Sequence, residues 1–132
     1  MDRFNDLADS SIDELCVLLK LAGKLEREPE PRALQGKVLA LLFLNPSLRT
    51  LTSFQAAMAR LGGSSFVVSP EMSIHRLEYR NGIVMDGVAA EHIREAVPVI
   101  ASYGHAMGIR VLADRHSLEQ DLADRSSESW PP

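Results

Sequence analysis

Hydrophobic and polar positions divide the chain into alternating helical and extended segments. The first helix is predicted to begin just after Ser11, which forms a capping box with Glu14. Apolar residues then recur at helical spacing as far as Ala22. Charged residues followed by Pro29 end this helix and begin a polar loop.

A continuous apolar run at 37–44 is the strongest extended signal in the chain. Its length and its glycine and proline flanks are typical of a strand buried on both faces of a parallel sheet. An amphipathic helix is predicted from Leu48 until Gly62, and a short β-rich segment follows at 64–69.

The second half of the chain continues this alternation. We expect an irregular polar segment, a helix, a strand and a last helix at 70–87, 91–103, 107–112 and 117–124. Pro98 lies inside the expected helix, so a kink or a late start is predicted there. Alternating helices and strands indicate an α/β domain with αβα layers and a mostly parallel sheet. We assign the domain to 1–125 and a disordered tail to 126–132.

Composition supports one globular domain and gives no sign of a nucleic-acid partner. The 132 residues are 45% hydrophobic and 24% charged, with a formal net charge of −4. This balance excludes a disordered class and offers no positive field for nucleic acid. If the ligand is an anion, the positive charge that holds it must be local.

The single cysteine, Cys16, excludes an internal disulfide framework and favours a reduced, cytoplasmic location. It lies on the apolar stripe of the first helix, so a small core residue is favoured over a reactive thiol. The acidic N-terminus does not resemble a signal peptide, and the longest apolar run is too short to cross a membrane. No metal-ligand cluster is visible in the sequence, and we expect no metal and no cofactor.

The sharpest candidate for chemistry is Ser47-Leu48-Arg49-Thr50, between the buried strand and the next helix. Free backbone N–H groups and the helix dipole favour an anion at such a junction. The hydroxyls of Ser47 and Thr50 add donors, and Arg49 can bind two oxygens. The spacing also permits a plain alternative, in which Ser47 only caps the helix and Arg49 is a solvated side chain.

The segment Phe-Leu-Asn-Pro-Ser-Leu-Arg-Thr-Leu-Thr-Ser-Phe at 43–54 resembles the carbamoyl-phosphate motif of the aspartate/ornithine carbamoyltransferase family. The Asn-Pro before the serine resembles the form that this motif takes in the branch that uses N-acetylornithine or N-succinylornithine. A second segment, Gly-Ile-Val-Met-Asp-Gly at 82–87, supports the same branch. The resemblance extends from about 36 to 112.

This resemblance implies the fold of the family's first domain and a reaction in which carbamoyl phosphate carbamoylates the amine of an ornithine derivative in arginine biosynthesis. By the family's pattern, Ser47, Leu48, Arg49 and Thr50 hold the phosphate through side chains and backbone N–H groups. Arg110 supplies a second guanidinium. Without the family, Arg110 could instead pair with an acid such as Asp114. The family also implies a homotrimer and no metal or cofactor.

Two positions depart from the family's pattern. Leu51 stands where an arginine commonly follows the motif, which weakens the case for full activity. In the acetyl- and succinylornithine branch, a tryptophan reaches into a neighbouring subunit's site. Here that position is occupied by His75, which could contact phosphate across an interface or be an exposed loop residue. Arg76 could serve the same purpose.

The resemblance covers less than half of a family chain. The family's His-Pro-x-Gln motif and its amino-acid-binding domain lie beyond residue 132. We therefore expect a truncated chain with little activity alone. The alternatives are a non-catalytic remnant or assembly module that retains a trimer interface, and a domain of an ornithine or aspartate carbamoyltransferase.

Overall fold

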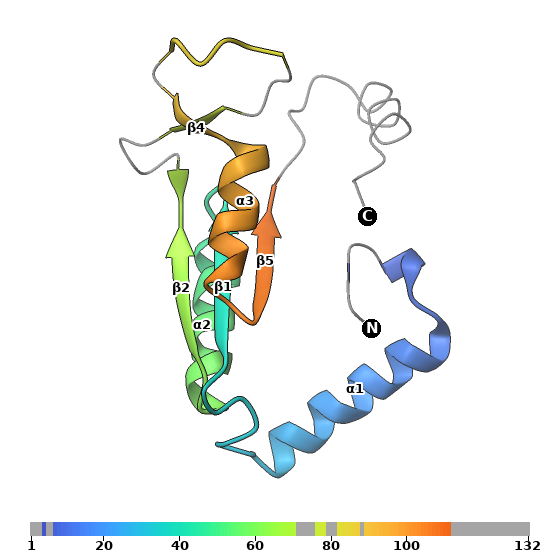
Figure 1. Ribbon diagram of the computed structural model, residues 1–132. Coiled ribbons are helices and arrows are strands. Elements are labelled where there is room, and N and C mark those ends of the chain that lie inside the picture. The colour runs from blue at the N-terminus through green and yellow to red at the C-terminus, as the bar shows by residue number, and fades with distance from the viewer. Residues whose placement is uncertain (1–3, 5–6, 71–75, 79–81, 88, 112–132) are drawn as a thin grey trace.

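The computed structural model describes residue 4 and residues 7–70, 76–78, 82–87 and 89–111 (Figure 1). The predicted last helix at 117–124 and tail at 126–132 lie outside the described residues. A short 3-10 helix, Leu7–Asp9, comes before the other elements. These are α1 (Ile12–Arg27), β1 (Val38–Phe43), α2 (Leu48–Arg60), β2 (Ser64–Val68), β3 (Arg76–Glu78), β4 (Ala89–His92), α3 (Ile93–Ser102) and β5 (Ala106–Arg110).

Three parallel strands form the main sheet, in the order β2-β1-β5. Figure 1 shows α3 in front of this sheet and α2 behind it. The predicted αβα layering with a parallel sheet is therefore confirmed. The chain moves from β1 to β2 on one side and later returns to β5 on the other side of β1, so β1 is the strand at which the direction of winding changes.

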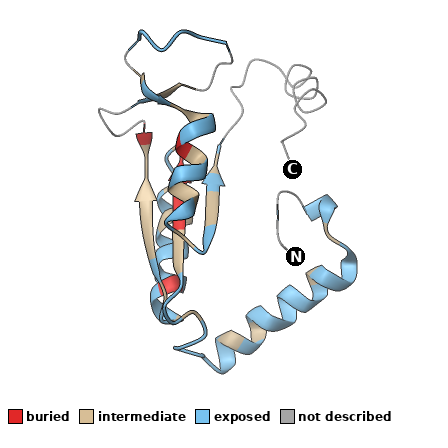
Figure 2. Ribbon diagram, viewed as in Figure 1, coloured by how far each residue is buried: buried red, intermediate tan, exposed pale blue. Residues whose placement is uncertain are grey.

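Strand β1 provides most of the core. Ala40, Leu41, Leu42 and Phe43 are between 0% and 4% exposed, which confirms a strand buried on both faces. Among the described residues, Met58 from α2, Ala96 from α3 and Pro70 just after β2 are also buried (Figure 2). Burying a leucine side chain contributes roughly 1.5–3 kcal/mol, so Leu41 and Leu42 are major contributors to stability.

Helix α1 forms as predicted, but it does not join the core. Its capping box is present, with Glu14 N–H donating to Ser11 Oγ at 3.2 Å and Ser11 N–H donating to Glu14 Oε2 at 2.9 Å. The helix contains no buried residue, and Cys16 is exposed (Figure 2). The prediction that Cys16 is a core residue is therefore wrong. Periodicity shows that one face of a helix is apolar, but it does not show what covers that face.

The segment expected to be irregular contains a strand. Arg76–Glu78 pairs in parallel with Ala89–His92, forming a second, two-stranded sheet. Because Glu91 and His92 belong to β4, helix α3 starts at Ile93, later than the predicted position 91, and it includes Pro98. A three-residue strand carries almost no periodicity, so its pairing with β4 could not be identified from the pattern.

No helix within the described ranges is long and apolar enough to cross a membrane. The same ranges contain no group of three or more His, Cys, Asp or Glu side chains placed to hold a metal ion.

Candidate functional site

The carboxyl ends of β1, β2 and β5 meet at one edge of the main sheet, and the candidate residues lie there. Arg110, the last residue of β5, is the register partner of Phe43, the last residue of β1. Just past the strand, Leu44 N–H donates to the Arg110 carbonyl at 2.9 Å. The sheet thus brings Arg110 beside the chain segment that leads into the 47–50 motif.

Ser47 occupies the N-cap position of α2, with φ −154° and ψ 97°, but its side chain makes no cap hydrogen bond. Its hydroxyl instead donates to Thr50 Oγ1 at 2.9 Å. The two hydroxyls therefore lie together at the start of the helix. The simple capping alternative for Ser47 is not what the structure shows.

The first turn of α2 presents further donors at the same place. Its first backbone hydrogen bond runs from Leu51 N–H to the Ser47 carbonyl at 3.0 Å, so the preceding N–H groups lie at the free end of a 13-residue helix. Arg49 is exposed in this turn. The hydroxyls of Thr52 and Ser53 differ, since they donate to helix carbonyls at 2.9 Å. Donors and partial positive charge therefore gather at residues 47–50.

Arg110 is half-buried, and its Nε is buried without a hydrogen-bond partner among the described residues. The ion pair seen in the described part of the chain joins Lys24 and Glu30 at 2.8 Å, well before the motif in sequence. Asp114, the alternative partner considered for Arg110, lies outside the described residues. A buried donor without a partner is costly, so this nitrogen is suited to an added acceptor.

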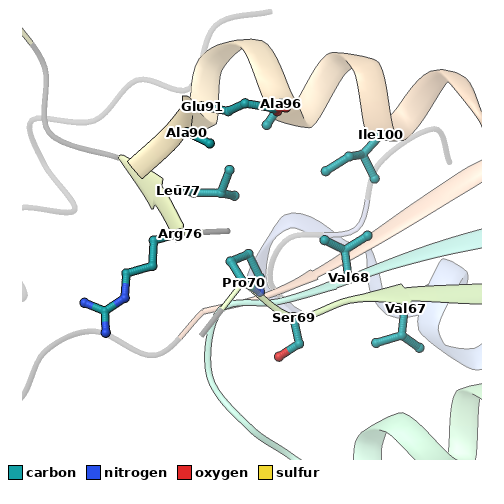
Figure 3. A pocket seen from close by; sticks show the side chains of 10 residues that line it. All are labelled: Val67, Val68, Ser69, Pro70, Arg76, Leu77, Ala90, Glu91, Ala96 and Ile100. Atoms are coloured by element: carbon teal, nitrogen blue, oxygen red, sulfur yellow. The ribbon is translucent and has the colours of Figure 1, made fainter. Parts of the chain in front are cut away.

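The contacts predicted for His75 and Arg76 across a subunit interface stay predictions. His75 lies outside the described residues. Arg76 begins β3 and is exposed, and Figure 3 shows its guanidinium pointing away from the neighbouring pocket. That pocket, about 450 Å³, lies between the end of β2, the β3–β4 sheet and α3, and its lining is mostly apolar.

Two further histidines, His92 and His105, accept hydrogen bonds from backbone N–H groups. His92 is the N-cap of α3, and its Nδ1 accepts a hydrogen bond from Arg94 N–H at 3.2 Å. His105 Nδ1 accepts one from Val38 N–H at 3.2 Å. His92 thus holds the start of α3, and His105 holds the start of β1.

The sequence reasoning missed Ser69, which follows β2 at the same edge. Its hydroxyl donates to the Phe43 carbonyl at 3.3 Å. The available signal was the Ser-Pro pair directly after a β-rich segment, which marks an abrupt strand end.

Proteins of the α/β class generally bind ligands at the carboxyl edge of a parallel sheet, at the strand where the direction of winding changes. A polar loop and a helix N-terminus lie at that place here. Comparison with known proteins makes this assignment specific. Residues 3–129 match the family described as aspartate/ornithine carbamoyltransferase, carbamoyl-P binding domain. The chain belongs to this family, as the motif resemblance predicted.

Relatives in the family include N-acetylornithine and N-succinylornithine carbamoyltransferases. The chain is 35% identical to the N-acetylornithine enzyme of Xanthomonas campestris over 130 residues, which is 98% of this chain and 38% of the relative. It is 37% identical to the N-succinylornithine enzyme of Bacteroides fragilis over 87 residues, which is 66% of this chain and 27% of the relative. The chain thus spans well under half the length of these enzymes.

Solved structures give the same result for the fold. An N-acetyl-L-ornithine transcarbamylase mutant complexed with carbamyl phosphate and N-succinyl-L-norvaline is similar, with a TM-score of 0.83 and 36% identity. The similarity covers 96% of this chain and 38% of that one. Acetylornithine transcarbamylase complexed with acetylcitrulline is similar to the same extent, with a TM-score of 0.83 and 35% identity.

Proposed function

We propose that this chain is a carbamoyl-phosphate-binding unit of a carbamoyltransferase. In this proposal the phosphate binds at residues 47–50, held by the hydroxyls of Ser47 and Thr50, the Arg49 guanidinium and the first N–H groups of α2, including that of Leu48. Arg110 provides the second guanidinium. The family match and the ligand named for the related transcarbamylase support this assignment.

The observation that carries the proposal is the pairing of Phe43 with Arg110 at the ends of β1 and β5. Two segments far apart in the sequence are joined there by the hydrogen bond from Leu44 N–H to the Arg110 carbonyl, at 2.9 Å. Arg110 then lies beside one end of the short segment 44–46, and the N-terminus of α2, which carries Arg49, lies at its other end. A dianion such as a phosphate group suits this combination of donors and charge.

The same geometry explains how binding would assist the reaction. Attack of an amine on the carbamoyl carbon breaks the bond to the phosphate oxygen, and negative charge accumulates on the departing phosphate. Fixed cations and N–H dipoles aimed at that group stabilise the transition state more than the bound substrate. Positioning contributes the rest, and no covalent intermediate with the protein is needed.

For the acceptor amine we propose N-acetylornithine or N-succinylornithine, which places the unit in cytoplasmic arginine biosynthesis. For N-acetylornithine the support is the extent of the match, which reaches 98% of this chain for an N-acetylornithine enzyme. N-succinylornithine is kept because of the Asn-Pro before Ser47 and the segment at 82–87, since its enzyme matches 66% of this chain. An ornithine enzyme of Thermus thermophilus and an aspartate enzyme of Clostridium botulinum match 84% and 74% of it. The family pattern assigns acceptor binding to a second domain, so we expect little turnover from these 132 residues alone.

Calorimetric titration with carbamoyl phosphate tests the proposal. Arg49→Ala removes a charge-assisted contact, so we expect affinity to fall roughly tenfold to a hundredfold. Arg60→Ala is the matched control, because Arg60 is an exposed arginine at the opposite end of the same helix. It should leave affinity unchanged, and inorganic phosphate should compete with carbamoyl phosphate.

A wild-type chain that releases no heat with carbamoyl phosphate or phosphate would contradict the proposal. Equal affinities for Arg49→Ala and Arg60→Ala would do the same, since the positive charge at residue 49 would then have no special role.

An assembly role is the second candidate, and the exposed apolar surface of α1 favours it. Ile12, Val17 and Leu19 are 79%, 62% and 73% exposed. Surfaces of this kind mark contacts with other protein surfaces. We propose that the chain forms a homotrimer in this role, and light scattering should then give three times the monomer mass. A monodisperse monomer would exclude it.

A further inference from the structure

We infer that Ser69 is a positioning residue for the candidate phosphate site, because its hydroxyl replaces a sheet hydrogen bond that Pro70 cannot donate. This inference rests on the proposed function and extends it to a residue outside the motif. The group that Ser69 positions is the peptide unit joining Phe43 to Leu44, at which the chain leaves β1 toward the 47–50 motif.

The missing bond follows from the register of the sheet. At the start of the β1–β2 ladder, Ser64 N–H donates to the Lys37 carbonyl at 2.9 Å. Donors and acceptors on one side of a strand recur every second residue. Continuing this ladder with the observed register brings residue 70 to the Phe43 carbonyl. Residue 70 is a proline, which has no N–H to donate.

Ser69 supplies the donor instead. Its Oγ lies 3.3 Å from the Phe43 carbonyl oxygen, and Ser69 is half-buried. Figure 3 shows Pro70 at the neighbouring pocket and the Ser69 hydroxyl pointing away from that pocket. The Phe43 carbonyl is therefore not left without a partner at the buried end of the central strand, where a lost hydrogen bond would be costly.

This contact holds one end of a planar unit whose other end holds Arg110. The Phe43 carbonyl and the Leu44 N–H belong to the same rigid peptide group and point in opposite directions. One accepts from Ser69, and the other donates to the Arg110 carbonyl at 2.9 Å. Rotation of this unit would change both the direction in which the chain leaves β1 toward the 47–50 motif and the hydrogen bond from Leu44 to β5. The two contacts together therefore fix the start of this segment relative to Arg110.

Binding measurements on single variants provide the first test. Ser69→Ala should weaken carbamoyl phosphate binding roughly threefold to tenfold, because small displacements of positioned donors reduce binding. Ser69→Thr keeps the hydroxyl and should bind like the wild type. Ser102→Ala is the matched control, since Ser102 Oγ also donates to a backbone carbonyl, at 2.7 Å, at the end of α3. It should have no effect.

A double-mutant cycle distinguishes positioning from general destabilisation. Pro70→Ala restores an N–H that can complete the ladder to Phe43. In that background, Ser69→Ala should cost less than about twofold in affinity, because the hydroxyl is then redundant. Hydrogen exchange gives a readout independent of ligand: the Leu44 amide should exchange faster in Ser69→Ala than in the wild type or in Ser102→Ala.

The outcomes separate this inference from the proposed function. If the wild type binds carbamoyl phosphate and Arg49→Ala loses it, but Ser69→Ala binds normally, the positioning role is wrong and the proposed function stands. An undiminished effect of Ser69→Ala in the Pro70→Ala background would also overturn the inference. A wild type that does not bind at all removes the proposed function itself.

Discussion

Ser11 and Ser47 both precede a helix, and their hydroxyls form different hydrogen bonds. Ser11 accepts from Glu14 N–H and forms a complete capping box. Ser47 makes no cap bond and turns its hydroxyl to Thr50. The same residue type at the same position thus stabilises one helix and leaves the first turn of the other available to a ligand.

Replacing Ser47 should therefore affect binding more than stability. An N-cap serine normally contributes about 1 kcal/mol, but Ser47→Ala removes no cap bond and should lower the free energy of unfolding by less than this. Carbamoyl phosphate affinity should fall about threefold to tenfold as one donor is lost. Thermal unfolding and calorimetric titration measure the two effects. If the free energy of unfolding falls by the full value of about 1 kcal/mol and the affinity is unchanged, Ser47 serves the helix alone.

Among the helices, α1 depends most on its own local contacts, because none of its residues is buried. The pKa of Glu14 is lowered from its ordinary value, mainly by the hydrogen bond from the Ser11 backbone N–H and then by the Ser11 side chain. A lowered pKa means that the folded helix favours the charged carboxylate. This contribution is present above the ordinary pKa of glutamate and is lost as pH falls through the lowered value.

Acidification from pH 6 to pH 3 should therefore loosen the start of α1. Amide hydrogen exchange, corrected for its intrinsic pH dependence, should show reduced protection in the first turn at the lower pH. Glu14→Gln should show low protection at both pH values. Glu26→Gln, which changes an exposed residue near the other end of the helix, should behave like the wild type. A pH-independent first turn in the wild type would contradict this account of the capping box.

The elements also show what a sequence can and cannot predict. The strand at 38–43 and the helix from Leu48 were predictable, because their apolar patterns and flanking turn residues are local signals. Strand β3 was not, since three residues become a strand only by pairing with β4. The candidate motif at 47–50 was visible from its residue types. The pairing of Arg110 with Phe43 and the contact of Ser69 with the Phe43 carbonyl depend on strand order and register, which no local pattern contains.

Across the whole molecule, burial is uneven. Of the six hydrophobic core residues buried within the described ranges, four belong to β1 and none belongs to α1. A protein with this distribution opens locally where apolar contacts are few, well before it unfolds globally. The central strand therefore lies in the most stable part of the described chain, and the candidate site begins where that strand ends.

Native-state hydrogen exchange should reveal this gradient. Amides of Ala40–Phe43 should exchange most slowly, at a rate set by global unfolding, while those of α1 should exchange by local opening. Denaturant should accelerate the β1 amides strongly and the α1 amides weakly. Equal protection and equal denaturant dependence in both elements would mean that α1 is covered in solution by a contact outside the described fold.

The position of β5 in the chain has a consequence for biosynthesis. The 47–50 motif leaves the ribosome long before Arg110, which is the last residue of the main sheet to be made. Because β5 must dock against a strand synthesised far earlier, its pairing is a slow, non-local step of folding. A nascent chain arrested between β2 and β5 would carry Ser47, Arg49 and Thr50. It would still lack Arg110 and the strand that pairs with β1 beside these residues.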